Sequence, residues 1–168
     1  MTPMEFVYIT ALRGRFHLEG RLMDIERLIA QLKSDEGFSP VAYFDNDQWS
    51  YGYGCKAPHE GAAISLHDAE ALLADRVQLA IRDFEDIYSD CRDNINEVRA
   101  EALCNMAFNL GKTKLLKFRN MNAAIRRNDW MDAAHHAITS LWYTQVGSRA
   151  RRICGELATG KETLTRMA

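Results

Sequence analysis

The sequence predicts an α+β fold that is mainly helical, with one β-hairpin near its beginning. Residues 24–36 carry apolar side chains at helical spacing, between residue types that favour helix ends. Residues 41–54 follow with two short strand patterns around a turn. From residue 65 the apolar spacing is helical almost to the end of the chain.

The first helix is expected to run from Asp24 to Glu36, because Gly37 is the residue type that follows helix ends. Its apolar stripe consists of Ile25, Leu28, Ile29 and Leu32. A carboxylate on the last helical residue faces the negative end of the helix dipole, which disfavours the anion by about 0.3–1 kcal/mol. Glu36 therefore suits a carboxyl group that must hold a proton, provided that burial adds to this small effect.

The hairpin is expected to pair a strand at 41–44 with a strand at 49–54, through a turn at 46–48. Period-2 alternation places Trp49, Tyr51 and Tyr53 on one face, and Ser50, Gly52 and Gly54 on the other. The second face is bare apart from one hydroxyl, which permits close approach by another backbone or a ligand. Taken alone, Asp45 reads more simply as a turn residue, and the glycines as a bend or bulge.

Helical patterns account for most of the remaining chain. Ser65 is expected to cap a helix that runs to about Tyr88, long enough at about 1.5 Å per residue to join two lobes. Further helices are expected at 98–111, where Gly111 stops the pattern, and at 118–127, 130–140 and 149–158.

Two polar residues in this helical part have open interpretations. Asn109 lies between two apolar neighbours and is equally consistent with a buried hydrogen-bonding residue or a cleft residue. Arg149 begins a basic run, and on its own it reads as a solvated arginine.

Composition indicates one soluble domain, or two small lobes that share a helix. Charge is uneven, since residues 1–91 hold 8 Lys/Arg against 16 Asp/Glu and residues 92–168 hold 13 against 7. The basic half is compatible with a cell wall, a membrane surface or a nucleic acid. The four cysteines form no Cys-x-x-Cys and are expected to be free thiols. His135 and His136 point about 100° apart on a helix, which argues against a shared metal.

Residues 1–23 contain a short apolar run, 6–9, that is soon interrupted by arginines. This pattern lacks the continuous apolar stretch of a signal peptide or membrane anchor. The segment could be a packed element, a regulatory cover or a loosely held tail. A packed element is favoured, because its apolar side chains would be costly to leave in water.

Three separated motifs within residues 24–160 resemble the phage-type lysozymes, the muramidase family typified by the lysozyme of the T-even phages. The first is Asp-Glu-Gly at 35–37, followed by a hairpin Asp, a hydroxyl and Gly-Tyr-Gly at 52–54. The second is Asn-x-x-Phe-Asn-x-Gly at 105–111, and the third is Ser-x-Trp-Tyr-x-Gln-x-x-x-Arg-Ala at 140–150. Three departures are Ser50 for the usual Thr, an Asp-to-hydroxyl spacing one residue short, and Cys55 in place of a His.

The resemblance implies a lysozyme-like α+β fold with a small lobe at about 24–64, a connecting helix at about 65–88 and a helical lobe at about 92–168. Residues 1–23 would be an N-terminal extension. The implied reaction is inverting hydrolysis of the β-1,4 linkage between N-acetylmuramic acid and N-acetylglucosamine in peptidoglycan. Glu36 would protonate the leaving oxygen, while Asp45 and Ser50 position or activate water.

The resemblance also implies that Phe108, Asn109 and Arg149 bind substrate, with Arg149 near Glu36. No cofactor or metal is expected. Glycan strands are the expected partner, with an anionic wall or membrane surface as a second; nucleic acid is not expected, and the chain should be a monomer. A phage endolysin would be made in the host cytoplasm and reach the periplasmic wall after release through the inner membrane. A lytic transglycosylase, or a catalytically silent wall-binding or tail-structural module, remains an alternative.

Overall fold

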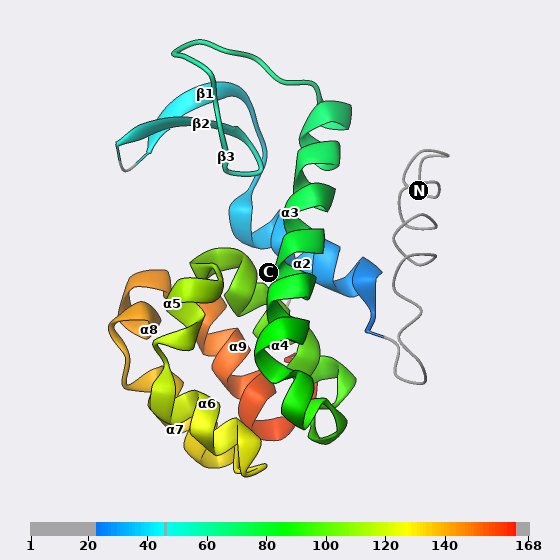
Figure 1. Ribbon diagram of the computed structural model, residues 1–168. Coiled ribbons are helices and arrows are strands. Elements are labelled where there is room, and N and C mark those ends of the chain that lie inside the picture. Colours follow the sequence, from blue (N-terminus) through cyan, green and yellow to red (C-terminus); the bar gives the residue numbers. More distant parts are fainter. Residues whose placement is uncertain (1–22, 46, 164–168) are drawn as a thin grey trace. The chain divides into compact units, whose positions relative to one another are not determined.

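The computed structural model describes residues 23–45 and 47–163 (Figure 1). Within them the chain is mostly helical and has one three-stranded antiparallel sheet, so the predicted α+β class is confirmed. The chain divides into two compact units, Ile25–Gln78 and the part from Leu79 onward together with residues 23–24. The predicted N-terminal extension lies outside the described residues, apart from Met23.

Helix α2, Ile25–Glu36, begins and ends within one residue of the prediction. It buries Ile25, Leu28 and Leu32, three of the four residues of the predicted stripe. Gly37 follows with φ +67°, and its N–H donates to the Lys33 carbonyl at 3.0 Å. A left-handed glycine therefore ends the helix at Glu36, as the sequence indicated.

The sheet has the order β1-β2-β3, with β1 at Ser39–Asp45, β2 at Gln48–Gly52 and β3 at Cys55–Lys56 (Figure 1). The hairpin of β1 and β2 confirms the prediction. The expected continuation of the second strand to residue 54 is wrong. The strand ends at Gly52, whose φ is +60°, and residues 53–54 form a turn into β3. Two left-handed glycines, Gly52 and Gly54, produce this reversal.

The bare strand face predicted from the glycines is covered within the first unit. A Cβ added to Gly52 would lie 3.0 Å from the Cβ of Ala69, on helix α3. On the other side of β1, the Ala42 N–H donates to the Ala62 carbonyl at 2.8 Å, so part of the following loop pairs with this strand. At Gly52, therefore, the close approach is made by a helix of the same chain.

Helix α3, Leu66–Tyr88, is shared by both units and has 23 residues. Ser65 caps it as predicted, because its hydroxyl oxygen accepts the Asp68 N–H at 3.0 Å. One face of the helix is buried, including Leu73, Val77, Ile81 and Phe84, whereas Leu72 is 36% exposed.

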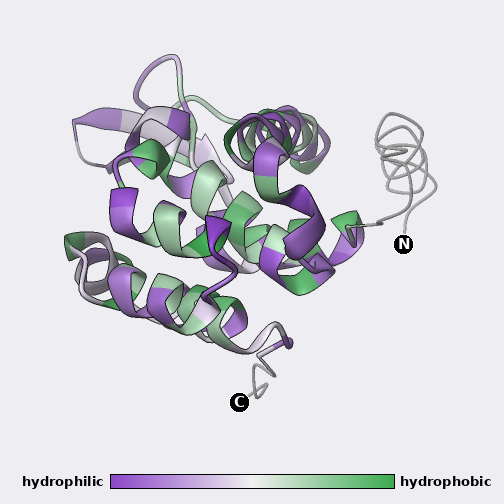
Figure 2. Cartoon of the chain, turned by 60° about the horizontal axis from the view of Figure 1, so that its bottom comes forward, coloured by the Kyte–Doolittle hydropathy of each residue, from purple (hydrophilic) through white to green (hydrophobic). Residues whose placement is uncertain are grey.

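The core of the second unit forms around α4, Glu97–Leu110, which packs against α9, Ser148–Thr159. Residues 100–107 of α4 are all buried, as expected of a helix enclosed on every side. Helix α7, Trp130–Ile138, packs on both α9 and α6, Arg119–Arg126. Along the more peripheral helices, apolar and hydrophilic residues form stripes (Figure 2).

Three short elements of this unit were not predicted. They are the 3₁₀ helix η1 at Ser89–Asn94, α5 at Lys112–Leu116 and α8 at Leu141–Val146. The other helices of the unit match the predicted segments to within about two residues, the usual scatter of helix ends. Across the part of the chain that the structure describes, no helix combines the length and apolar character needed to span a bilayer.

Candidate active site

The register of the hairpin brings Asp45 and Ser50 to one face of the sheet. Tyr43 pairs directly with Ser50, and Asp45 pairs with Gln48. Paired residues of antiparallel strands project to the same side, and residues two apart on one strand share a face. Asp45, Tyr43 and Ser50 therefore share a face, with Asp45 diagonal to Ser50.

The two hairpin residues differ sharply in exposure. Ser50 is only 1% exposed, whereas Asp45 is exposed at the end of β1. On its other side Ser50 pairs with Lys56 of β3. The carboxylate therefore meets solvent directly, and the hydroxyl lies behind it within the sheet.

The carboxyl group of Glu36 rests against Gly54. A Cβ built on Gly54 would lie 2.9 Å from Glu36 Oε2, closer than side-chain atoms normally approach. Gly54 also has φ +68°, a conformation that side-chain-bearing residues rarely adopt. The φ value favours glycine at this position, and the missing side chain leaves the space that the Glu36 carboxyl occupies.

The phenol of Tyr43 interacts electrostatically with both Glu36 and Asp45. Partial burial raises the pKa of the Tyr43 phenol, and the nearby carboxylates of Asp45 and Glu36 raise it further, while Arg76 opposes them. Because charge–charge interaction falls with distance, both carboxylates lie within electrostatic range of this phenol. The structure therefore brings the predicted acid and the predicted second carboxylate to the same region of the sheet.

Arg76 of α3 was not predicted as a site residue. Its Nη1 donates to the carbonyls of Tyr53 at 2.8 Å and Gly54 at 3.3 Å. The sequence held one signal, since Arg76 falls at helical spacing between the buried residues Leu73 and Ala80. A charge at a position of the apolar stripe needs a partner, but only the fold shows that the partners are these carbonyls.

A second group of predicted residues lies in the helical unit. Asn109 is exposed, and its Oδ1 accepts the indole N–H of buried Trp142 at 2.8 Å. Phe118 meets the same indole edge-on, with ring centroids 6.1 Å apart. Asn109 is therefore hydrogen-bonded but exposed, so the interpretation as a buried residue was wrong, and a role in a cleft stays a prediction.

Arg149 is buried, so the reading of a solvated arginine was wrong. It is 8% exposed, and its Nε donates to Asn105 Oδ1 at 2.7 Å. Its guanidinium carbon lies 5.9 Å from the ring centroid of Phe108, within the range of a cation–π contact. Glu36 and Arg149 belong to different units, and their predicted approach stays a prediction.

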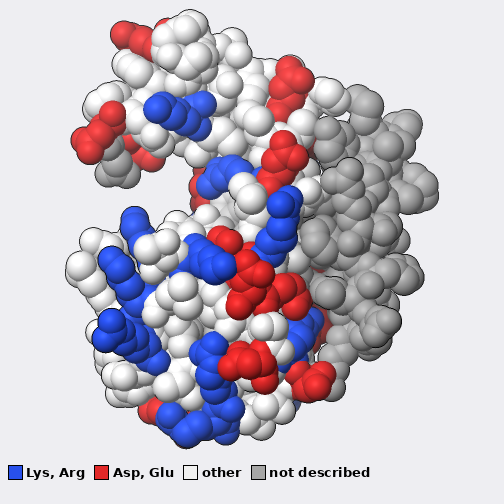
Figure 3. Space-filling view, in the orientation of Figure 1, with Lys and Arg blue, Asp and Glu red and all other residues white. Residues whose placement is uncertain are grey.

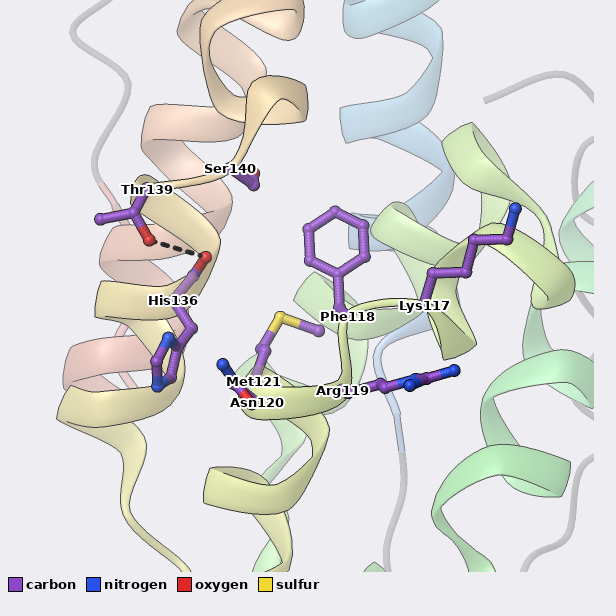
Figure 4. Close-up of a pocket in the computed structure, with 8 residues that line it drawn as sticks. All are labelled: Lys117, Phe118, Arg119, Asn120, Met121, His136, Thr139 and Ser140. Carbon is purple, nitrogen blue, oxygen red and sulfur yellow. Dashed lines mark hydrogen bonds between the residues drawn. The ribbon is translucent and has the colours of Figure 1, made fainter.

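A pocket of about 340 Å³ opens beside this group (Figure 4). Phe118 and Met121 project between the start of α6 and the end of α7, while Lys117 and Arg119 extend away from His136. The pocket is lined by Lys117, Phe118, Arg119, Asn120, Met121, His136, Thr139 and Ser140. It combines an apolar floor with hydroxyl, imidazole and cationic groups.

Comparison with known proteins assigns the family. Residues 33–155 match the model of the Phage lysozyme family. A probable T4-type lysozyme 2 of Dictyostelium discoideum is 30% identical over 99 residues, which are 58% of this chain and 58% of that protein. The pre-baseplate central spike protein Gp5 of Enterobacteria phage T4 is 28% identical over 155 residues, 77% of this chain but 27% of that protein. This chain thus spans little more than half of the first relative and about a quarter of the second. Its matched segment is nevertheless most of its own length, and the chain belongs to the phage lysozyme family.

Proposed function

We propose that this chain is a lysozyme that hydrolyses the β-1,4 linkage between N-acetylmuramic acid and N-acetylglucosamine in bacterial peptidoglycan. The observation that carries the proposal is the position of the Glu36 carboxyl beside Gly54, in the same region as Asp45. Family membership supplies the substrate class.

Glu36 acts as the general acid, giving its proton to the glycosidic oxygen as the bond to the anomeric carbon breaks. A water attacks that carbon from the opposite face, and Asp45 accepts the proton that the water loses. Ser50 lies behind Asp45 on the same face and supports the water or the carboxylate through its hydroxyl. A held water, rather than a covalent sugar ester, makes the reaction inverting, and no cofactor takes part.

The helical unit supplies substrate contacts in this proposal. Asn109 is accessible and has an amide nitrogen that can donate to a sugar, while Trp142 holds its oxygen. Phe108 and Arg149 support the same surface from beneath. Lys117 and Arg119 provide positive charge for an anionic wall.

The proposed biological role is that of a phage endolysin. The protein would be made in the host cytoplasm, would pass the inner membrane with help from another factor, and would then cut the periplasmic wall as a monomer.

The match to the phage T4 spike protein favours a second candidate, a wall-cutting or structural module of a phage tail. That match covers more of this chain than the match to the Dictyostelium lysozyme does. A tail module would be found in purified virions, whereas an endolysin would be found in the lysate and absent from the particles. Immunodetection of the chain in banded virions separates the two roles.

The chemistry is tested by incubating the pure protein with isolated peptidoglycan and identifying the products. Inverting hydrolysis gives new reducing ends whose first-formed anomer is α, visible by proton NMR before mutarotation. A first-formed β-anomer would overturn the inverting mechanism. Anhydromuramic ends without new reducing sugar would identify a transglycosylase, and unchanged peptidoglycan would leave a silent binding module.

A further inference from the structure

The short turn between β2 and β3 is held from outside the sheet. Residues 53–54 form the reversal between left-handed Gly52 and the strand β3, and Gly54 itself is left-handed. Arg76 Nη1 donates to both carbonyls of this turn, Tyr53 at 2.8 Å and Gly54 at 3.3 Å. The same nitrogen lies 3.7 Å from the Cys55 sulfur. One guanidinium thus contacts three consecutive residues.

An arginine is well suited to fix a backbone in this way. Its guanidinium is planar and always charged, so its hydrogen bonds to carbonyls are charge-assisted and directional. Arg76 projects from α3, where its neighbours Leu73 and Val77 are buried at 1% and 0% exposure. The donor is therefore anchored on a packed helix, and the turn is located relative to that helix.

The position of this turn determines where the Glu36 carboxyl can lie. The position that a Gly54 Cβ would take lies 2.9 Å from Glu36 Oε2 and 3.9 Å from Arg76 Nη1. The carboxyl and the guanidinium therefore both approach the position that a Gly54 side chain would take. The Glu36 carboxyl thus occupies the space that a side chain at residue 54 would fill, and a movement of the turn changes the room available to it.

We propose that Arg76 is a positioning residue that holds the turn at residues 53–54 and thereby sets the orientation of the Glu36 carboxyl. The inference rests on the proposed function, in which Glu36 is the general acid. In this proposal Arg76 acts through the backbone of Tyr53 and Gly54, whose carbonyls accept its hydrogen bonds.

The first test replaces Arg76 with Gln and with Lys, and compares both with Arg82→Gln, an exposed arginine on the same helix. Misplacement of a catalytic group by about 1 Å can lower the rate by about 10²-fold, so kcat should fall by about 10–100-fold with little change in KM. Lys retains the charge and one donor, and should restore part of the loss. Arg82→Gln should remain within about twofold of the parent, since surface substitutions usually have small effects.

The second test uses a matched pair of glycines. Gly54 and Gly61 have φ +68° and +72°, but a Cβ meets Glu36 only at Gly54 and meets nothing within 4 Å at Gly61. Alanine at either site imposes similar backbone strain, so Gly61→Ala measures the loss of melting temperature that is due to strain alone. Only Gly54→Ala should lose activity, because only there does the new methyl displace the carboxyl.

A third measurement does not depend on catalysis. In protein labelled with ¹³C at Glu carboxyl carbons, the Glu36 resonance should move in Arg76→Gln and Gly54→Ala, and stay in place in Arg82→Gln and Gly61→Ala. An unmoved Glu36 resonance in Arg76→Gln and Gly54→Ala would overturn the positioning role. Equal activity losses in Arg76→Gln and Arg82→Gln, or in Gly54→Ala and Gly61→Ala, would overturn it as well. If the parent protein left peptidoglycan intact, the proposed function would fail, while this resonance would still decide the role of Arg76.

Discussion

At the scale of single residues, the site depends on what surrounds Glu36 more than on the carboxyl group alone. Glu36 is the last residue of α2, and its carboxyl lies beside Gly54. The missing side chain of Gly54 leaves room for this carboxyl, and the phenol of Tyr43 lies within its electrostatic range. A carboxyl held in this way can keep one orientation toward a bound glycosidic oxygen.

Replacing Glu36 with Gln tests the general acid directly. The amide keeps the shape of the side chain but has no acidic proton to transfer, so wall-clearing activity should fall by at least about 10²-fold. The melting temperature should hold or rise, since a neutral amide of the same shape replaces the carboxyl group at the C-terminal end of α2. Glu60→Gln, at an exposed loop position of the same unit, is the control and should remain active. Activity of Glu36→Gln near that of the parent would refute the assignment.

The sequence predicts the identity of the hairpin residues better than their environment. Asp45 and Ser50 follow from motif spacing, and strand alternation puts them on one face. The burial of Ser50 to 1% exposure depends on β3, which has only two residues and no detectable pattern. Arg76 lies 22 residues from Gly54 in the chain, so its role emerges only when α3 packs beside the turn.

At the scale of elements, the long patterns were predictable and the short ones were not. Helices α2, α3 and α4 have 12, 23 and 14 residues, enough to repeat an apolar spacing several times. Helices α5 and α8 have 5 and 6 residues, less than two full turns, so no periodicity can appear in them. Their presence follows from packing in the helical unit and from the glycines at their ends, Gly111 and Gly147.

The cap of α3 should contribute a pH-dependent part of the stability. The hydrogen bond from Ser65 lowers the pKa of Asp68, and the contact with His67 lowers it further. The folded state therefore favours the Asp68 carboxylate, and this contribution is present above about pH 4 and lost as pH falls through the lowered pKa. Ser65→Ala should cost about 1 kcal/mol at neutral pH. The difference from the parent should shrink in acid, as followed by urea unfolding at several pH values; Ser148→Ala, inside the first turn of α9, is the control.

Tyr88 joins three elements through buried hydrogen bonds. Its hydroxyl, at the end of α3, donates to Asn122 Oδ1 of α6 at 2.6 Å, and the Asn122 amide donates to the Leu115 carbonyl of α5 at 3.0 Å. Burial raises the pKa of Tyr88, so the phenol keeps its proton and remains a donor.

Removing this donor should weaken the helical unit. Tyr88→Phe leaves a buried amide oxygen without that bond and should cost about 1–3 kcal/mol of unfolding free energy. For a chain of this size, each 1 kcal/mol corresponds to a loss of about 2–4 °C in Tm. Tyr143 is a half-buried tyrosine on α8, and the Tm of Tyr143→Phe serves for comparison. An unchanged Tm in Tyr88→Phe would show that the network contributes nothing to stability.

At the scale of the whole molecule, charge is distributed unevenly along the chain. Residues 112–127 contain six Lys/Arg and no Asp or Glu. In Figure 3, several Lys and Arg side chains lie next to one another on the surface of the helical unit. Three of the six contact carboxylates: Lys112 with Asp86, Arg126 with Asp90 and Arg127 with Asp132. The segment that includes Lys114, Lys117 and Arg119 is suited to attract an anionic wall.

Activity on intact walls should therefore fall as salt rises. Between about 0.01 and 0.15 M salt the Debye length shrinks from about 30 to about 8 Å, which screens attraction between exposed charges. The double variant Lys117→Gln, Arg119→Gln should show a flatter salt response than the parent, while Lys161→Gln should retain it. A parent protein whose rate did not change with salt would remove electrostatic attraction from the account.

All four cysteines of the chain are buried and unpaired, and they lie in four different elements. They are Cys55 in β3, Cys91 in η1, Cys104 in α4 and Cys154 in α9. Burial raises the pKa of the Cys91 and Cys104 thiols, and it raises the pKa of the Cys154 thiol to about 11. These three thiols are therefore protonated and slow to react at neutral pH.

The native protein thus carries its own reporters of local opening. A thiol reagent added in short pulses can modify each cysteine only when the element around it opens, and mass spectrometry can tell the four sites apart. Their relative labelling rates would rank β3, η1, α4 and α9 by how often each becomes exposed. This measurement uses the native cysteines and needs no engineered one.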